Sequence, residues 1–380
     1  MAIDIAALQE KFKALKWVSS VFSGPKNVLG VDIGSYAVKV VLIQTEGGVP
    51  VVKVWGHLPL NSKPEASPEE KKAQAINVLR AFLIEKGIKI KDAASSLSGN
   101  SVIVRYVKFP RLTKSELSAT LATEAEPFIP FDINEVYLGF YILNDIVEDG
   151  QKKMETVLVA AKKDLVVSRL DVLQGAGLFP RVIDVDSFAL ENVYEKSREP
   201  KAEAGATLYL NIGHMVTNLS IIDNGITRVV RDVFISGGTL TKAIMKGLQV
   251  DFNKAEELKK SYGVLVDAAD KEKALQDGDR EALGVSQAVS AVVKDLVAEV
   301  HRSVDFYLSQ GPERSIGRIV LAGGTARLKN LAKHLSAELK VPVSVLEPFS
   351  FMKNVPGDIP AELAPAFGVA VGLSLRSSRE

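Results

Sequence analysis

The chain has 380 residues, a net charge of +1 and no cysteine. The absence of cysteine excludes disulfides, thiolate metal sites and cysteine nucleophiles, and it agrees with a cytoplasmic location. The balanced charge gives no global field that would attract nucleic acid, and the four histidines show no ligand spacing for zinc. No stretch approaches 18 consecutive apolar residues, so we expect no transmembrane segment.

The N-terminal segment, 1–26, predicts an amphipathic helix. Apolar residues recur there at spacings of three and four, from Ile5 through Leu8 and Phe12 to Phe22, with lysines between them. Such a helix could dock on the body of the protein, lie on a membrane surface or pack on a partner. We expect docking on protein first, because many terminal helices cover apolar surface.

Residues 28–43 predict two β-strands joined by a tight turn. Asp32, Gly34 and Ser35 lie at that turn, and Lys39 follows in the second strand. A glycine there permits backbone angles that a Cβ would forbid, so that N–H groups can converge on an anion. Lys39 would bring a positive charge to the same anion, and Asp32 suits a hydrated Mg²⁺. Taken alone, the pattern is also typical of an ordinary hairpin turn.

A second copy of the pattern occurs at residues 208–222. When the two stretches are aligned without a gap, Asn211 falls on Asp32 and Gly213 falls on Gly34. Two such stretches at one constant offset predict two similar halves. One hairpin turn from each half could then clamp the phosphates of a nucleotide.

The remaining elements of the first half follow in chain order. Gly87 ends a helix, Thr113 and Glu116 form a capping box for another, and Ser187 caps a third. A strand, helix, strand, strand, helix unit over residues 98–178 predicts a small α+β subdomain. The expected strands are 49–59, 93–98, 102–109, 137–143, 155–161 and 181–186, and the expected helices are 68–87, 114–126, 164–175 and 188–196.

The second half repeats the alternation of strands and helices. We expect Thr239 and Asn253 to cap two helices, and an apolar stripe from Val285 to Tyr307 predicts a long helix packed on a core. Small residues at 365–375 predict a helix that packs closely on another helix. The expected strands are 228–235, 317–322 and 341–345, and the other helices are 240–247, 254–262 and 327–339.

The order of these motifs resembles the actin-like ATPase superfamily. Asp32-x-Gly-Ser-x-x-x-Lys39 resembles its first phosphate loop and Asn211-x-Gly213 its second. Residues 184–189 and 365–374 resemble the two connecting segments, and residues 319–325 resemble the adenosine motif.

Within that superfamily, the inserted subdomain is similar to that of FtsA. The segments 124–131, 176–192 and 302–307 resemble the PilM family of type IV pilus assembly proteins. The resemblance covers about residues 27–375.

This resemblance implies an α/β chain with an actin-like fold, that is, two ribonuclease-H-like domains with a small α+β subdomain inserted in the first. The expected divisions are an N-terminal helix at 1–26, the first core domain at 27–97 and 179–204, the inserted subdomain at 98–178, the second core domain at 205–239 and 305–356, its helical subdomain at 240–304, and a C-terminal connecting helix at 357–380.

The resemblance also implies bound ATP and Mg²⁺. Gly34, Ser35 and Lys39 would hold the β- and γ-phosphates, and Asp32 would hold Mg²⁺ through water. Glu256 and Lys259 resemble a ribose-contacting pair, although a solvated helix face explains that short match equally well. The further expected nucleotide-binding residues are Tyr36, Asn211, Gly213, His214, Gly237, Gly238, Gly323, Gly324 and Thr325.

One residue departs from the superfamily pattern. Asn211 stands where related ATPases have Asp, and an amide cannot act as a base or carry charge for a metal. We therefore predict nucleotide binding with hydrolysis near background, and no catalytic residue is assigned.

The family implies that the protein recruits the cytoplasmic N-terminal tail of PilN, an inner-membrane protein, and associates with that membrane through partners. Other inner-membrane or motor proteins of pilus assembly and a homo-oligomer are further expected partners, and nucleic acid is not. An FtsA-like filament-forming membrane tether and a small-molecule kinase of the same superfold are the alternatives.

Overall fold

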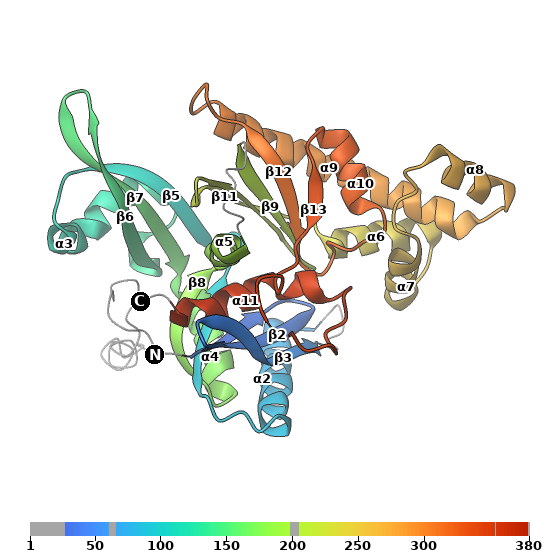
Figure 1. Ribbon diagram of the computed structural model, residues 1–380, viewed down its shortest axis with the longest axis horizontal. Helices are drawn as coiled ribbons and strands as arrows, with labels where there is room; N and C mark the ends of the chain where they lie inside the picture. Colours follow the sequence, from blue (N-terminus) through green and yellow to red (C-terminus); the bar gives the residue numbers. More distant parts are fainter. Residues whose placement is uncertain (1–26, 61–65, 198–204, 354, 379–380) are drawn as a thin grey trace.

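The computed structural model describes residues 27–60, 66–197, 205–353 and 355–378. The helix expected at residues 1–26 lies outside them. Two halves stand side by side, each built on a five-stranded sheet (Figure 1). Within the described residues, no helix is long and apolar enough to cross a membrane.

The first sheet has the strand order β3-β2-β1-β4-β8. Its strands β1, β2 and β3 form an antiparallel meander, while β4 and β8 run parallel to β1. Both faces are buried, which explains the nearly unbroken apolar runs. The strands are β1 (Leu29–Ile33), β2 (Ala37–Glu46), β3 (Val49–Pro59), β4 (Asp92–Leu97) and β8 (Phe179–Val185).

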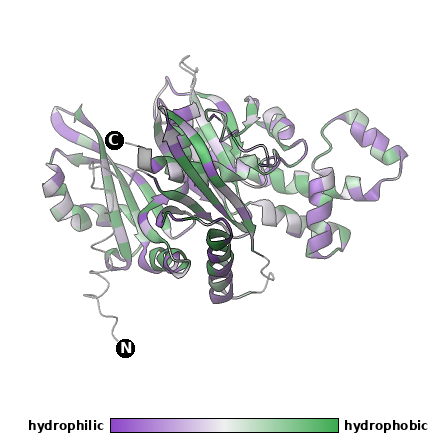
Figure 2. Cartoon of the chain, turned by 60° about the horizontal axis from the view of Figure 1, so that its bottom comes forward, coloured by the Kyte–Doolittle hydropathy of each residue, from purple (hydrophilic) through white to green (hydrophobic). Residues whose placement is uncertain are grey.

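Neighbouring residues of β2 enter different cores. Val40 packs with α2 (Pro68–Glu85) and α4 (Lys163–Gly175) on one face of the sheet. Val41 packs with α5 (Asp186–Ser197) and α11 (Gly368–Ser374) on the other face. Helix α2 accordingly has one hydrophobic and one hydrophilic side (Figure 2).

The second sheet repeats the first. Its order is β11-β10-β9-β12-β13, again an antiparallel meander extended by two parallel strands. Its strands are β9 (Ala206–Ile212), β10 (Thr217–Asp223), β11 (Ile226–Val233), β12 (Ile316–Ala322) and β13 (Val343–Val345), and its helices are α6 (Gly237–Leu248), α7 (Phe252–Tyr262), α8 (Ala268–Gln276), α9 (Arg280–Leu308) and α10 (Leu331–Leu339).

The insertion between β4 and α4 is a three-stranded sheet with the order β5-β7-β6. Helix α3 covers one face, and the other face packs against α5 and β11 through a cluster around Val104, Val157 and Val185. Its elements are β5 (Val102–Pro110), α3 (Lys114–Ala125), the short 3-10 helices η1 (Glu126–Phe128) and η2 (Ile133–Glu135), β6 (Val136–Glu148) and β7 (Gln151–Lys162). Helix α4, which the sequence pattern groups with this unit, buries its side chains with the first sheet.

The small residues near the C-terminus permit close packing at the centre of the molecule (Figure 1). A Cβ on Gly372 would collide with the carbonyl oxygen of Ala189 in α5, and a Cβ on Gly30 would collide with that of Ala370. Helix α11 is flanked by two 3-10 turns, η3 (Ala364–Phe367) and η4 (Leu375–Ser378), so the helix expected over 365–375 is shorter than predicted.

Four local predictions were wrong. Ser187 does not cap α5, because that helix already begins at Asp186 and Ser187 lies within it. Helix α10 begins at Leu331, four residues later than expected. Ser236, and not Thr239, caps α6, because the helix already begins at Gly237. Asp251, and not Asn253, caps α7, since its side chain accepts from the Lys254 N–H at 2.8 Å.

Candidate functional site

Two equivalent turns, one from each half, face each other. The Gly34 N–H donates to the Ala37 carbonyl at 3.1 Å, and at the matching point of the second half the Gly213 N–H donates to the Val216 carbonyl at 3.0 Å. Neither glycine has a positive φ, so the prediction that a glycine is needed here for backbone angles that a Cβ would forbid was wrong. The requirement is space: a Cβ on Gly34 would lie 2.8 Å from Lys39 Nζ, and one on Gly213 would lie 2.8 Å from the Val216 oxygen.

Asp32 and Lys39 form an ion pair behind the first turn. They are register partners across β1 and β2, and Lys39 Nζ lies 2.7 Å from Asp32 Oδ2. Each side chain keeps 14% of its surface exposed, so both can also reach a ligand bound at this turn. The pairing holds a cation and a carboxylate at the base of the first turn.

The second turn is held by the start of α6. The Gly237 N–H donates to the Gly213 carbonyl and the Gly238 N–H to the His214 carbonyl, both at 2.8 Å. A Cβ on Gly238 would lie 2.6 Å from the His214 oxygen. Gly237 and Gly238 therefore position the second turn, and their N–H groups are already used within the protein.

The glycines after β12 differ in their role. Gly323 has φ +87° and donates to the Pro365 carbonyl at 3.0 Å, and a Cβ there would lie 2.8 Å from Asn211 Oδ1. Gly324 has no heavy atom within 4 Å of an added Cβ, so it borders open space. The Thr325 N–H bonds the Ile212 carbonyl at 3.2 Å, which ties this segment to the second turn.

Glu256 and Lys259 are a buried ion pair and not a solvated helix face. They are 9% and 8% exposed, and Lys259 Nζ lies 2.5 Å from Glu256 Oε1. Lys259 also bonds Thr241 Oγ1 at 2.8 Å and the Gly237 carbonyl at 3.3 Å, so the pair joins α7 to the start of α6. Burial lowers the pKa of Lys259. Burial alone would raise the pKa of Glu256, but the charge of Lys259 and the hydrogen bonds from Lys259 and Thr241 outweigh this effect, so the pKa of Glu256 is lowered.

Aromatic rings connect the two turns. The Tyr36 ring lies 5.5 Å from that of His214, which lies 6.2 Å from Phe252. The pKa of His214 is lowered by burial and then by the charge of Lys259. The pKa of His57 on β3 is lowered by burial and then by Lys39. In both cases burial is the largest cause and favours the neutral imidazole.

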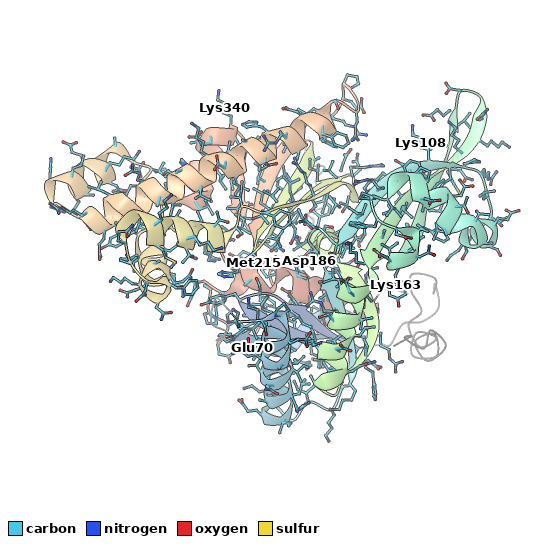
Figure 3. All side chains as sticks on the ribbon, turned by 180° about the vertical axis from the view of Figure 1, so that it is seen from behind. Glu70, Lys108, Lys163, Asp186, Met215 and Lys340 are labelled. Atoms are coloured by element: carbon cyan, nitrogen blue, oxygen red, sulfur yellow. The ribbon has the colours of Figure 1, made fainter. Side chains whose placement is uncertain are left out.

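Two residues that the sequence reading missed lie behind the first turn. Asp186 begins α5, and Ser96 Oγ donates to its Oδ1 at 2.5 Å. Burial, followed by the charge of Asp32, raises the pKa of Asp186 to about 7. Arg169 of α4 donates through Nη1 to the Ile33 carbonyl at 2.7 Å, and burial lowers its pKa. Asp186 lies centrally, where the halves meet (Figure 3).

The signal for Asp186 was present in the sequence. A polar residue directly after a buried parallel strand lies at the carboxyl end of the sheet, where ligands of α/β folds bind. The motif at 184–189 is recognisable in the sequence, but we assigned no role to its second aspartate, Asp186, from the sequence alone. Arg169 had no such signal, because only the tertiary packing of α4 brings it to the first turn.

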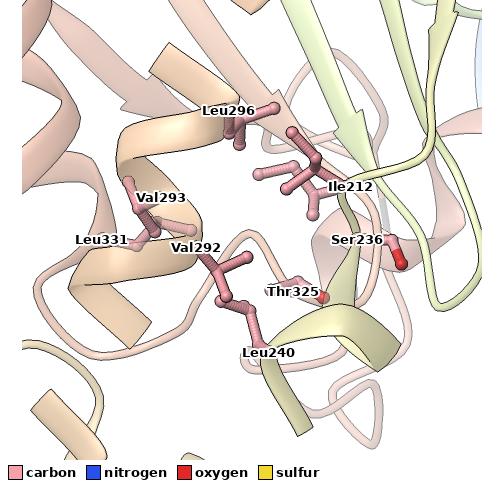
Figure 4. A pocket seen from close by; sticks show the side chains of 9 residues that line it. Ile212, Ser236, Leu240, Val292, Val293, Leu296, Thr325 and Leu331 are labelled. Carbon is pink, nitrogen blue, oxygen red and sulfur yellow. The ribbon is translucent and has the colours of Figure 1, made fainter. Parts of the chain in front are cut away.

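A cavity beside the adenosine motif is not a ligand site. It lies between β9, α6 and α9, and its lining is mostly apolar, including Leu240, Val292 and Leu296 (Figure 4). Its volume of about 10 Å³ is at the limit for one water molecule. Thr325 and Ser236 border it, but the gap is a packing space in the second core.

The residues present fit a hydrated Mg²⁺ better than a protein-caged metal. Within the described parts of the chain, no group of three His, Cys, Asp or Glu side chains could hold a metal ion. Mg²⁺ usually keeps several waters and uses one or two carboxylates together with substrate phosphates. Asp32, partly exposed beside Gly34, satisfies that requirement.

The duplicated sheets, the paired glycine turns and the connecting helix α11 define an actin-like fold. In agreement with this, the chain aligns with the ethanolamine utilization protein EutJ from Carboxydothermus hydrogenoformans at a TM-score of 0.52, with 16% identity, covering 98% of this chain and 99% of that one. This similarity concerns the fold alone.

The chain belongs to the type IV pilus assembly protein PilM family, whose model matches residues 30–378. A solved structure described as the PilM-PilN type IV pilus biogenesis complex is similar at a TM-score of 0.78 and 28% identity, covering 93% of this chain and 99% of that chain. The predicted family and the predicted fold class are thus confirmed.

Proposed function

We propose that this protein is an ATP-binding scaffold of type IV pilus assembly. The observation that carries the proposal is the pair of equivalent turns at Gly34 and Gly213, each closed by the same hydrogen bond. Two equivalent turns facing one another suit a polyphosphate, which is negative on all sides. Lys39 supplies the counter-charge, and Ser35 supplies a hydroxyl.

In this proposal Mg²⁺ is held by Asp32 through water and by the phosphates, and it neutralises phosphate charge. The adenosine would lie along Gly323, Gly324 and Thr325, where Gly324 borders open space. Glu256 and Lys259 lie on α7 against the start of α6 and would reach the ribose from there. The rings of Tyr36 and His214 would lie over the phosphates.

Ligand-induced stabilisation tests this site. At about 100 times its Kd, ATP with Mg²⁺ should add about 2.7 kcal/mol to the apparent free energy of unfolding. Lys39→Ala and Asp32→Ala should both reduce this thermal shift, whereas the exposed control Lys271→Ala on α8 should not. No shift with any purine nucleotide, in protein stripped of carried-over ligand, would refute the site.

We further propose that the partner is the cytoplasmic tail of PilN, bound as an extended peptide beside the inserted subdomain, which would bring the protein to the inner membrane. The similar solved structure is a complex with PilN, which supports this choice of partner. The inserted sheet offers two edge strands, β5 and β6, and an extended peptide gains backbone hydrogen bonds at such edges.

The junction between the subdomain and the first core is the surface to probe. There Lys163 bonds the Asn134 carbonyl at 2.7 Å and lies over the Tyr137 ring. Phe128 of η1, beside Phe109 in the subdomain, is 41% exposed. Lys163 and Lys108 mark opposite ends of the subdomain (Figure 3). Phe128→Glu and Lys163→Glu should weaken binding of a PilN tail peptide, and Lys271→Glu should not. Equal binding by all variants would contradict this location.

A further inference from the structure

A second cavity lies on the side of the first turn that faces α2 and α4. It has a volume of about 160 Å³. Its polar lining comes from the turn and from both helices: Ser35, Lys71, Lys72, Ser168 and Arg169. No carboxylate is among the described residues that line it, so its chemistry is that of a cation-lined, hydroxyl-bearing site for an anion.

Arg169 brings an unused donor to this cavity. Its Nη1 bonds the Ile33 carbonyl at 2.7 Å, but its Nε is buried without any hydrogen-bond partner. A buried donor without a partner is costly, about 1–3 kcal/mol, and such a group in a native structure calls for a ligand or water. Asp186 and Asp32 are the acidic groups whose charges act on Arg169.

Lys71 is the free cation of the cavity. It forms no ion pair with any residue that the structure describes, whereas its neighbour Lys72 lies 2.8 Å from Glu69 and 3.6 Å from Asp171. Lys71 lies near the start of α2, whose N-cap is Ser67. Its charge also acts on His214 in the second half.

We propose that this cavity binds a phosphate group, held by Lys71 and the Nε of Arg169 beside the Ser35 hydroxyl. The volume excludes a whole nucleotide, because pockets for drug-sized ligands measure about 300–1,000 Å³. The phosphate is either the terminal group of the bound nucleotide or free inorganic phosphate. The first source rests on the proposed nucleotide site; the second does not.

The test compares Lys71→Gln with Lys71→Arg, which keeps the charge, and with Lys86→Gln, which removes an exposed lysine at the far end of the same helix. Two quantities are measured by titration calorimetry on the full chain. One is the ratio of ATP to ADP affinity. The other is the affinity of inorganic phosphate for the ADP-loaded and the nucleotide-free protein.

Lys71→Gln should lower one of these two quantities about tenfold, which corresponds to about 1.4 kcal/mol. Lys71→Arg and Lys86→Gln should both remain near wild type. A fall in the ATP to ADP ratio identifies the nucleotide's terminal phosphate, and a fall in phosphate affinity identifies free phosphate. If both quantities are unchanged in Lys71→Gln while ADP binds, the inference is wrong. If ADP does not bind the wild type, the proposed nucleotide site fails, and the phosphate titration alone decides the cavity.

Discussion

Asn211 and Asn218 hold, in the second half, the positions that Asp32 and Lys39 hold in the first. The offset along the chain is the same for both residues, and both pairs are register partners across equivalent strands. Lys39 Nζ lies 2.7 Å from Asp32 Oδ2, and Asn211 Nδ2 donates to Asn218 Oδ1 at 2.9 Å. One turn is therefore backed by an ion pair and the other by a neutral amide pair.

The amide pair continues into a chain of hydrogen bonds. Asn218 Nδ2 donates to Asp232 Oδ1 at 2.6 Å, and Asp232 also accepts from the Gly99 N–H. Burial raises the pKa of Asp232, against hydrogen bonds from Asn218 and Gly99 that lower it. The donors converge on Asp232 from both ends, and on the side of the second turn the direction runs from Asn211 through Asn218 to Asp232.

This direction predicts the effect of Asn211→Asp on stability. A carboxylate at residue 211 cannot donate, so it would face Asn218 Oδ1 with two acceptors opposed. We expect a loss of about 1–3 kcal/mol in the free energy of unfolding, the usual effect of leaving a buried polar group unsatisfied. Urea denaturation of the nucleotide-free protein measures it.

A second substitution should reverse the loss. In Asn211→Asp with Asp232→Asn, the new amide at 232 donates to Asn218 Oδ1, and Asn218 then donates to the carboxylate at 211. The double variant should be more stable than Asn211→Asp alone. Additive losses in the double-mutant cycle would show that the three side chains do not act as one chain.

The buried pair in α7 should be sensitive to removal of one partner. Lys259→Met leaves the Glu256 carboxylate without its cation in a site that is 9% exposed. Breaking a buried pair in this way typically costs about 3–5 kcal/mol. We expect Lys259→Met with Glu256→Leu to be more stable than Lys259→Met alone, as judged by urea denaturation. Equal stability of the two variants would mean that the pair is not desolvated.

Stability should fall as the pH rises through the range of Asp186. Its folded pKa of about 7 lies above the ordinary value of 3.8, so the folded state favours the protonated form. The associated stability is present at low pH and is lost between about pH 4 and pH 7. The groups acting on this carboxyl are Asp32, which raises its pKa, and Ser96, Ser98 and Arg169, which lower it.

Asp186→Asn removes this dependence. The free energy of unfolding of the variant, taken relative to wild type, should rise by about 2–3 kcal/mol when the pH is raised from 5 to 8, because one pKa unit corresponds to about 1.4 kcal/mol. The measurement is denaturation without nucleotide or Mg²⁺, with the exposed Asp295→Asn as the control. A gain that is the same at both pH values would contradict a raised pKa.

The repeated architecture was predictable because duplication leaves a pattern that one sequence contains twice. The constant offset between the two copies located both turns, and apolar runs located the strands of both sheets. Helix starts were less predictable. Ser236 and Thr239 are both good caps in isolation, and only the packing of Gly237 on the second turn selects the earlier one.

The site was predictable only in part, because two kinds of residue carry it. Gly34 and Lys39 act within the first hairpin and Gly213 acts within the second, so the sequence spacing within each hairpin places them in the structure. Arg169 lies 136 residues from Ile33, to which it donates. Such partners come together through the packing of α2, α4 and the first sheet, for which a single sequence has no local signal.

The last prediction concerns hydrolysis. Phosphoryl transfer depends on positioning and on charge around the phosphate and its metal. The first half retains Asp32 and Lys39, but the second presents an amide at residue 211, committed to Asn218. We therefore expect ATP to bind with turnover near background and to act as a structural ligand that holds the halves closed.

Asn211→Asp should raise hydrolysis above that background, and the variant that also carries Asp232→Asn should do so without the loss of stability. The carboxylate would then face the first turn from the position equivalent to Asp32. Single-turnover release of phosphate measures the rate, and Asn211→Ala controls for loss of the amide alone. Steady turnover by clean wild-type protein, abolished by Asp32→Ala, would contradict the prediction and make this an active ATPase.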